Sequence, residues 1–165
     1  YVVSTPSDVY RARQVILAIG RRGTPRRLGV PGEDLSNVAY GLLEPEQFRG
    51  LRSLVVGGGE AALEAACSLA DESDTQVTLS YRGTQFTRPK MAIRDRVERC
   101  VKAGRLEVLY SSNVQRIEET SVELEQAGEV VRLRTDQVFV FAGGELPTRI
   151  LEHTGVRVET KFGSR

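Results

Sequence analysis

Several residue types are scarce in this chain of 165 residues, and each scarcity argues against a class of protein. Tryptophan is absent, and histidine and methionine occur once each. No apolar run approaches the roughly 18 residues that a membrane-spanning helix needs, and no signal peptide or repeat is visible. The net charge of +1 gives the whole chain no preference for nucleic acid or lipid. The composition fits one globular domain with its own core.

Cysteine and histidine offer little chemistry here. Cys67 and Cys100 lie in predicted helices, on faces that otherwise carry alanine, leucine and valine. We expect both to be buried, unpaired thiols, which agrees with a reducing cytoplasm. His153 lies near the end of a short predicted helix, as a solvated or capping residue rather than a general base. No metal site and no catalytic side chain is predicted.

The chain begins at Tyr1 in a predicted strand, and its one methionine is Met91. We therefore expect a piece of a longer protein, with part of the active site outside it.

The apolar pattern between about residues 49 and 141 predicts an α/β fold. The expected elements are strands at 51–56, 76–81 and 106–110, helices at 60–70 and 91–103, a meander of strands at 113–118, 121–125 and 130–134, and a strand at 137–141. One stripe of the second helix carries Ile93, Val97, Cys100 and Val101. The predicted architecture is a Rossmann-like, three-layer domain. Its parallel sheet has helices on one side and the three-stranded β-meander on the other.

The two ends of the chain predict smaller pieces. These are a strand pair at 1–4 and 9–12, a buried strand at 15–19, a loop rich in arginine, glycine and proline at 21–37, a helical turn at 44–48 and a helix at 148–153.

The most informative motif is VVGGGEAALEAA, where a predicted strand, a glycine turn and a helix follow one another. It spells Gly57-x-Gly59-x-x-Ala62, a form of the dinucleotide fingerprint. Gly57 permits the tight turn, Gly59 lets a diphosphate approach the backbone, and Ala62 lets the helix pack closely. Free N–H groups at the helix start would bind the phosphates. The residues expected to bind the cofactor here are Gly57, Gly58, Gly59, Glu60, Ala61 and Ala62.

Two simpler interpretations of this motif account for less or remove a role from it. A glycine turn that only packs a helix on a sheet does not explain three successive glycines. Glu60 and Glu64 compensate the helix dipole, so they need no catalytic role.

The end of the next strand indicates which dinucleotide binds. NAD sites usually place an acidic residue there, but the sequence reads SYRGTQFTRPK, with Tyr81 followed by Arg82, Arg88 and Lys90. Guanidinium groups bind a 2′-phosphate that a carboxylate would repel. We therefore favour NADP(H) over NAD(H), with Tyr81, Arg82 and Arg88 at the site. The alternative is that these cations only solvate a loop.

Four motifs in order resemble the thioredoxin-reductase-like flavoproteins. VILAIG with RRGTPRRLGVPGED resembles a segment of their FAD domain, VVGGGEAALEAA and VTLSYR resemble their inserted NADPH domain, and VFVFAGGELPTRIL resembles the return to the FAD domain. The resemblance implies FAD-domain remnants at 1–36 and 142–165 around an NADP(H)-binding domain at 37–141. It also implies that the intact protein binds FAD, through a separate glycine motif that would precede Tyr1. In the resembling proteins, the positions of Gly143 and Gly144 lie near the flavin.

Two departures from that family narrow the resemblance. The region VAYGLLEPEQFRG lacks the CxxC dithiol of thioredoxin reductases. The chain is therefore closer to the branches that resemble ferredoxin–NADP reductases of the thioredoxin-reductase type and bacillithiol-disulfide reductases. The family's His-Arg-Arg is Tyr81-Arg82-Gly83 here, so one phosphate-binding arginine is missing.

The resemblance implies an FAD-dependent NAD(P)H oxidoreductase. Its NADP(H)-binding domain would pass hydride to the flavin of the same polypeptide, and electrons would go on to a disulfide or an iron–sulfur protein. A nucleotide-binding sensor without electron transfer is the alternative. An arginine cluster at 11–27 could suggest nucleic-acid binding, but stacking aromatics are scarce around it, so neither nucleic acid nor membrane is an expected partner. The oligomeric state, a homodimer included, stays open.

Overall fold

The computed structural model describes residues 1–16, 18, 24–72, 75–145, 148–157 and 159. Its contacts divide the chain into two compact units, one of residues 25–145 and one of residues 1–24 with 146–165. The larger unit holds the elements around the glycine turn.

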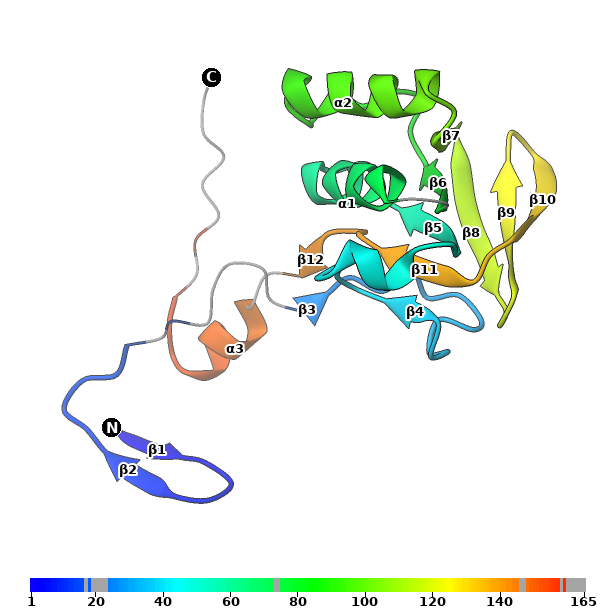
Figure 1. Cartoon of the computed structure of the whole chain (residues 1–165). Helices are drawn as coiled ribbons and strands as arrows, with labels where there is room; N and C mark the ends of the chain where they lie inside the picture. The colour runs from blue at the N-terminus through cyan, green and yellow to red at the C-terminus, as the bar shows by residue number, and fades with distance from the viewer. Residues whose placement is uncertain (17, 19–23, 73–74, 146–147, 158, 160–165) are drawn as a thin grey trace. The chain divides into compact units, whose positions relative to one another are not determined.

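The larger unit is built on a parallel sheet, as predicted, and this sheet has five strands. Its order is β4 (Val38–Ala39), β11 (Gln137–Val140), β5 (Arg52–Val56), β6 (Gln76–Tyr81) and β7 (Leu106–Tyr110). Helices α1 (Glu60–Asp71) and α2 (Met91–Lys102) cover one side of it. The antiparallel meander of β8 (Ser112–Ile117), β9 (Ser121–Gln126) and β10 (Glu129–Arg134) covers the other (Figure 1).

Alternation along the central strands produces the three layers. Leu54 packs in the cluster with the meander, whereas the next residue, Val55, packs in the cluster with the helices. In β11, Phe139 belongs to the helix side and Val138 and Val140 to the meander side. Because both faces of these strands are covered, they read as continuous apolar runs in the sequence.

The helix side is packed closely because α1 is rich in small residues. Ala62, Ala66 and Cys67 of this helix are fully buried. In α2, Val97 and Cys100 are buried, but Val101 is 42% exposed, so its predicted place on the buried stripe is wrong. Val101 is eight residues from Ile93, which at 3.6 residues per turn rotates it about 80° away from that stripe.

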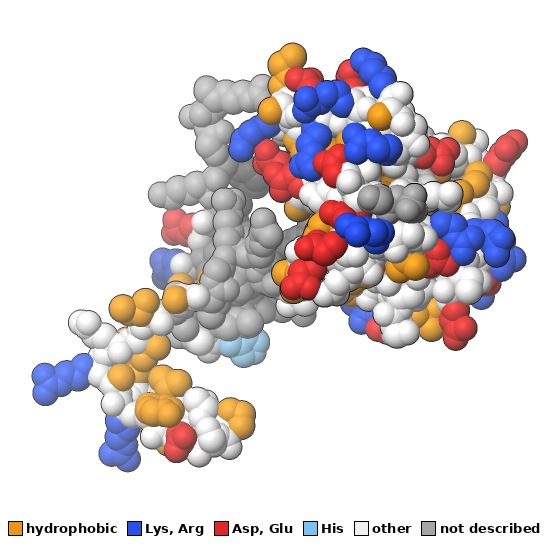
Figure 2. Space-filling model, in the orientation of Figure 1, with side chains coloured by type: hydrophobic (Ala, Val, Ile, Leu, Met, Phe, Trp, Pro, Cys, Tyr) orange, Lys and Arg blue, Asp and Glu red, His pale blue; other side chains and the backbone are white. Residues whose placement is uncertain are grey.

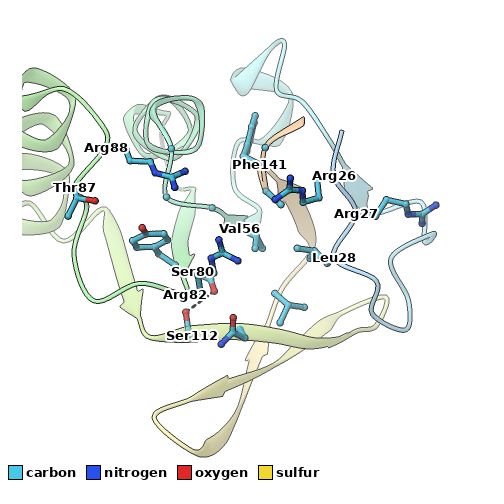
Figure 3. Close-up of a pocket in the computed structure, with 18 residues that line it drawn as sticks. Arg26, Arg27, Leu28, Val56, Ser80, Arg82, Thr87, Arg88, Ser112 and Phe141 are labelled. Atoms are coloured by element: carbon cyan, nitrogen blue, oxygen red, sulfur yellow. Dashed lines mark hydrogen bonds between the residues drawn. The ribbon is translucent and has the colours of Figure 1, made fainter. Parts of the chain in front are cut away.

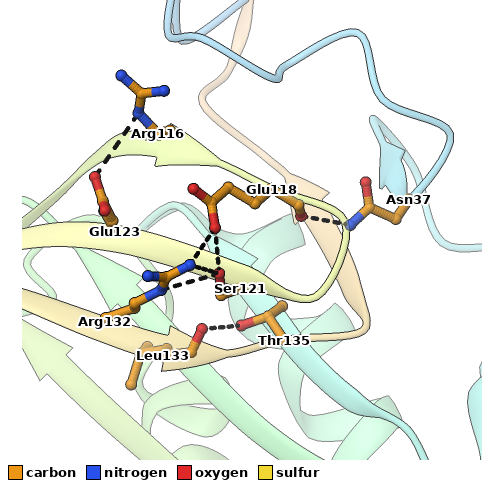
Figure 4. A network of polar contacts seen from close by, with 8 residues as sticks. All are labelled: Asn37, Arg116, Glu118, Ser121, Glu123, Arg132, Leu133 and Thr135. Carbon is orange, nitrogen blue, oxygen red and sulfur yellow. Dashed lines mark hydrogen bonds and ion pairs between the residues drawn. The ribbon is translucent and has the colours of Figure 1, made fainter.

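A polar network ties the meander to the sheet (Figure 4). Arg132 of β10 pairs with Glu118, whose carboxylate also accepts a hydrogen bond from Ser121 at 2.8 Å. These contacts, that of Ser121 first, lower the pKa of Glu118. Asn37, just before β4, donates to the carbonyls of Glu118 and Glu119 at 3.1 and 3.2 Å. The turn between β8 and β9 is thereby fixed against the edge of the parallel sheet.

Short elements complete the larger unit. The 3-10 helix η1 (Pro45–Phe48) lies where a helical turn was predicted. The strands β3 (Thr24–Pro25) and β12 (Gly144–Glu145) pair with each other, and the Arg26 N–H donates to the Gly143 carbonyl at 2.9 Å.

The smaller unit contains the predicted hairpin of β1 (Val2–Ser4) and β2 (Val9–Arg11), and the helix α3 (Thr148–His153). The predicted buried strand at 15–19 is wrong where it is described, since Val15 is 42% and Ile16 91% exposed without strand structure. An apolar segment forms a buried strand only where a sheet provides a neighbouring strand, and none of the described strands pairs with residues 15, 16 or 18. Residues 17 and 19 lie outside the described residues. None of the described helices is long and apolar enough to cross a membrane.

Candidate functional site

The glycine turn, Gly57–Gly59, joins the end of β5 to the start of α1. Gly57 has φ +146°, and its N–H donates to the Ser80 carbonyl at 2.9 Å. A Cβ at Gly57 would lie 2.6 Å from the carbonyl oxygen of Phe141 and 3.1 Å from the Cβ of Ala62. The turn therefore needs glycine for its backbone conformation and for close contact with β11 and α1.

The other two glycines differ in their surroundings. A Cβ at Gly58 would lie 2.1 Å from the ring of Tyr81, which stacks on Phe86 with ring centroids 5.2 Å apart. A Cβ at Gly59 would meet nothing within 4 Å. Gly59 is the N-cap of α1, and its carbonyl accepts from the Ala62 and Leu63 N–H groups, so the N–H groups of Glu60 and Ala61 have no intrahelical partner. The open side of Gly59 thus leaves room for an anion at the helix N-terminus.

A cavity of about 500 Å³ opens at this turn (Figure 3). Its walls come from the loop before β4, the glycine turn, the end of β6 with the following loop, the start of β8 and the end of β11. The lining residues are Arg26, Arg27, Leu28, Val56, Gly57, Gly58, Gly59, Ser80, Tyr81, Arg82, Thr87, Arg88, Ser112, Asn113, Val114, Phe141, Ala142 and Gly143. These residues include four arginines and no carboxylate. The cavity is therefore electropositive, as an anion site requires.

The arginines around the cavity differ in their partners. The guanidinium of Arg27 pairs with Asp34 and lies 3.7 Å from a Glu33 oxygen, and in Figure 3 it points away from the cavity. Arg26, Arg82 and Arg88 make no ion pair within the part of the chain that the structure describes. Their charges remain available to a ligand.

Most of the sequence-predicted site residues lie together around this cavity. Those that line it are Gly57, Gly58, Gly59, Tyr81, Arg82, Arg88 and Gly143. Glu60, Ala61, Ala62 and Gly144 do not line it. Ala62 is fully buried, which suits the packing role inferred for it. Lys90 lies 3.4 Å from a carboxylate oxygen of Glu60 and does not line the cavity.

Sequence reasoning missed the wall formed by β8 and β11. The Ser112 hydroxyl donates to the Leu109 carbonyl at 2.7 Å, so the Ser80 hydroxyl, 2.8 Å away, donates to Ser112. This buried bond joins the end of β6 to the start of β8. No motif marks Ser112, because only the folded topology brings the meander to this edge. Phe141 is part of the motif VFVFAGGELPTRIL, which was not assigned to the dinucleotide site.

The two cysteines and the histidine do not line the cavity. Cys67 and Cys100 are buried free thiols, as predicted, and burial followed by the neighbouring Cys100 raises the pKa of Cys67 to about 12. Such a thiol is a poor nucleophile at neutral pH. His153 is exposed at the end of α3. The described residues contain no cluster of ligands suited to a metal ion.

Comparison with known proteins gives consistent matches. Residues 1–162 match the family described as pyridine nucleotide-disulphide oxidoreductase. A ferredoxin–NADP reductase of Ignicoccus hospitalis is 45% identical over 111 residues, which cover 67% of this chain and 35% of that protein. Bacilliredoxin reductase Bdr of Bacillus subtilis is 28% identical over 165 residues, covering 99% and 51%.

A solved structure supports the same relationship. The bacillithiol disulfide reductase Bdr from Staphylococcus aureus superposes with a TM-score of 0.88 and 27% identity, covering 97% of this chain and 50% of that one. The chain spans about a third to about half of the length of the curated relatives described above.

Proposed function

Because the chain belongs to the pyridine nucleotide-disulphide oxidoreductase family, we propose that residues 37–141 form the NADP(H)-binding domain of an FAD-dependent oxidoreductase. Residues 1–36 and 142–165 would belong to its FAD domain, with Gly143 and Gly144 near the flavin. Bound NADPH supplies a hydride, which the intact protein would deliver to the flavin. The residues of this chain bind and orient the dinucleotide. The proposal includes a cytoplasmic location, which the buried free thiols suit.

The observation that carries the proposal is a pair of arginines beside the glycine turn that have no ion-pair partner among the described residues. Arg82 directly follows β6 and Arg88 lies in the next loop, and both line the cavity (Figure 3). We assign the adenosine 2′-phosphate to these two side chains, since β6 ends in Tyr81 without a carboxylate to repel it. The N–H groups at the start of α1 would bind the diphosphate.

The names of the relatives suggest the acceptor. They are ferredoxin–NADP reductase and bacilliredoxin reductase, so an iron–sulfur protein or a disulfide is the acceptor that we propose. A CxxC dithiol is absent from the sequence, and both described thiols are buried. Electrons would therefore pass from the flavin to the acceptor without using a pair of cysteines from this chain. A flavin spectrum of the intact protein that NADPH bleaches would support this role over that of a colourless nucleotide sensor.

Calorimetric titration of the chain with NADPH and NADH tests the cofactor assignment. The Arg82→Ala variant should bind NADPH about 10- to 100-fold more weakly, because a charge-assisted hydrogen bond is lost, while NADH binding changes by less than about twofold. Equal losses for both cofactors would remove Arg82 from the 2′-phosphate role. If the unaltered chain binds neither cofactor at millimolar concentration, the proposed function itself fails.

A further inference from the structure

The cavity has a second positive wall, which no dinucleotide motif marks. Arg26 lines it and reaches toward Phe141, on the opposite side from Arg82 and Arg88 (Figure 3). Its side chain is exposed and has no carboxylate partner among the described residues. Its backbone N–H donates to the Gly143 carbonyl at 2.9 Å, which fixes the start of this side chain beside the end of β11.

The loop that follows Arg26 explains why this guanidinium is left free. Glu33 is buried and accepts hydrogen bonds from the Leu28 N–H at 2.5 Å, the Gly29 N–H at 2.7 Å and the Tyr40 hydroxyl at 2.7 Å. Asp34 pairs with Arg27. Both acidic side chains of the GED sequence are thus occupied, while the loop is held in a defined conformation that presents Arg26 to the cavity.

The strand order sets the direction in which a dinucleotide would cross the cavity. β5, with the glycine turn at its end, lies between β6 and β11. If the adenosine 2′-phosphate lies at Arg82 beyond β6 and the diphosphate lies at the turn after β5, the rest of the molecule extends over the end of β11. That is where Arg26, Phe141 and Gly143 line the cavity.

We propose that Arg26 is a positioning residue for the nicotinamide half of the dinucleotide, binding the phosphate next to the nicotinamide ribose. Guanidinium suits this task because its planar donors bind phosphate oxygens in pairs. The inference rests on the proposed NADP(H) site, but it assigns a second anchor on the opposite wall. A dinucleotide bound at both phosphate ends would present its nicotinamide in a defined orientation for hydride transfer.

Two ligands distinguish contacts to the adenosine half of the cofactor from contacts to its nicotinamide half. NADP⁺ carries the nicotinamide half, whereas adenosine 2′,5′-bisphosphate lacks it. In calorimetric titrations of the full chain, Arg26→Ala should weaken NADP⁺ about tenfold and leave the bisphosphate within about twofold. Arg82→Ala should weaken both ligands. Arg26→Lys keeps the charge and should lose less NADP⁺ affinity than Arg26→Ala. Arg99→Ala is the control, since this exposed arginine of α2 does not line the cavity, and it should bind both ligands as the unaltered chain does.

Each outcome bears on a separate claim. Unchanged NADP⁺ binding in Arg26→Ala, with the loss in Arg82→Ala intact, overturns the role of Arg26 and leaves the proposed function standing. Equal weakening of both ligands by Arg26→Ala also overturns it, because the contact would then not be to the nicotinamide half. Thermal unfolding of each variant checks its fold, and Arg26→Gln replaces the alanine variant if that one unfolds. Failure of the unaltered chain to bind either ligand refutes the proposed function instead.

Discussion

At the scale of single residues, three adjacent glycines meet three different demands. Gly57 adopts a positive φ and lies close to the Phe141 carbonyl, Gly58 leaves space for the ring of Tyr81, and Gly59 has open space beside the start of the helix. Two of these reasons are internal to the fold, and only the third concerns a ligand. Substitutions at Gly58 and Gly59 should therefore separate stability from binding.

Gly58→Ala and Gly59→Ala form a matched pair. The new methyl group at Gly58 would displace the Tyr81 ring, and overpacking of this kind costs about 2 kcal/mol of unfolding free energy. At Gly59, where φ is −90°, alanine fits the backbone and costs only about 0.5 kcal/mol as a poorer N-cap. It should nonetheless weaken NADPH binding about tenfold or more by crowding the diphosphate. Urea unfolding and calorimetry measure the two effects. A Gly59→Ala variant that binds NADPH normally would contradict the placement of the diphosphate.

Sequence reasoning selected the three glycines of the turn, Arg82 and Arg88 from local motifs, and all five line the cavity. It could not find Arg26. That residue belongs to a cluster of arginines in a loop, and nothing in the sequence tells Arg26 from Arg27. The difference arises in the folded loop, where Arg27 pairs with Asp34 and Arg26 does not.

At the scale of elements, the strands with continuous apolar runs were predicted almost to the residue. β6 and β7 occupy the predicted ranges 76–81 and 106–110. β4 was missed, because Val38–Ala39 is too short for any pattern and exists through its pairing with β11. The sequence pattern thus predicts strands that are long enough to show a regular run of buried residues. A two-residue edge strand shows no such pattern, because it forms only by pairing with its neighbour.

The beginnings of β5 and β11 are joined by an ion pair that should be measurable. Asp136 accepts hydrogen bonds from the Arg52 N–H and Nε, both at 2.9 Å, and from the guanidinium at 2.6 Å. The side-chain bonds from Arg52, followed by the one from its N–H, lower the pKa of Asp136 to about 2. A carboxyl group whose folded pKa is depressed stabilises the fold above its unfolded pKa, and this stabilisation is lost as the pH falls toward 2.

Asp136→Asn should therefore lower the unfolding free energy at pH 7 by about 1 kcal/mol. The difference from the unaltered chain should shrink as the pH falls from about 4 toward 2. Urea unfolding across this pH range measures it. Glu123→Gln is the control, since its contact with Arg116 is 3.8 Å long and the Arg116 side chain is more than half exposed, and it should change stability by less than about 0.5 kcal/mol. A difference for Asp136→Asn that does not vary with pH would show that its ionisation contributes nothing.

At the scale of the whole molecule, stability resides in the larger unit. Both hydrophobic clusters draw their members from residues 28–142, on the two sides of one parallel sheet. The hairpin of the smaller unit leaves Val2, Val9 and Tyr10 more than half exposed, and Figure 2 shows hydrophobic side chains on its surface. The described residues that line the cavity all belong to the larger unit. Folding and dinucleotide binding should therefore not depend on the smaller unit.

The boundary of the folding unit can be tested with two isolated segments, 25–145 and 37–141. The family resemblance implies that the proposed NADP(H)-binding domain begins at residue 37, whereas contacts group residues 25–36 with the larger unit. Leu28, Val30 and Leu35 pack against the meander-side cluster, and the Ile117 N–H donates to the Pro31 carbonyl at 2.9 Å. Losing three partly buried aliphatic side chains should cost about 3 kcal/mol, a large part of a typical domain's stability.

We therefore expect segment 25–145 to unfold in urea at the midpoint of the full chain and to keep its NADPH affinity. Segment 37–141 should unfold at a clearly lower urea concentration, because removal of residues 25–36 exposes one side of the meander-side cluster. It should also bind NADPH more weakly, because it lacks Arg26. Equal midpoints for the two segments would show that the loop before β4 contributes no stability. A normal affinity in the shorter segment would count against Arg26 as an anchor, independently of the point substitutions.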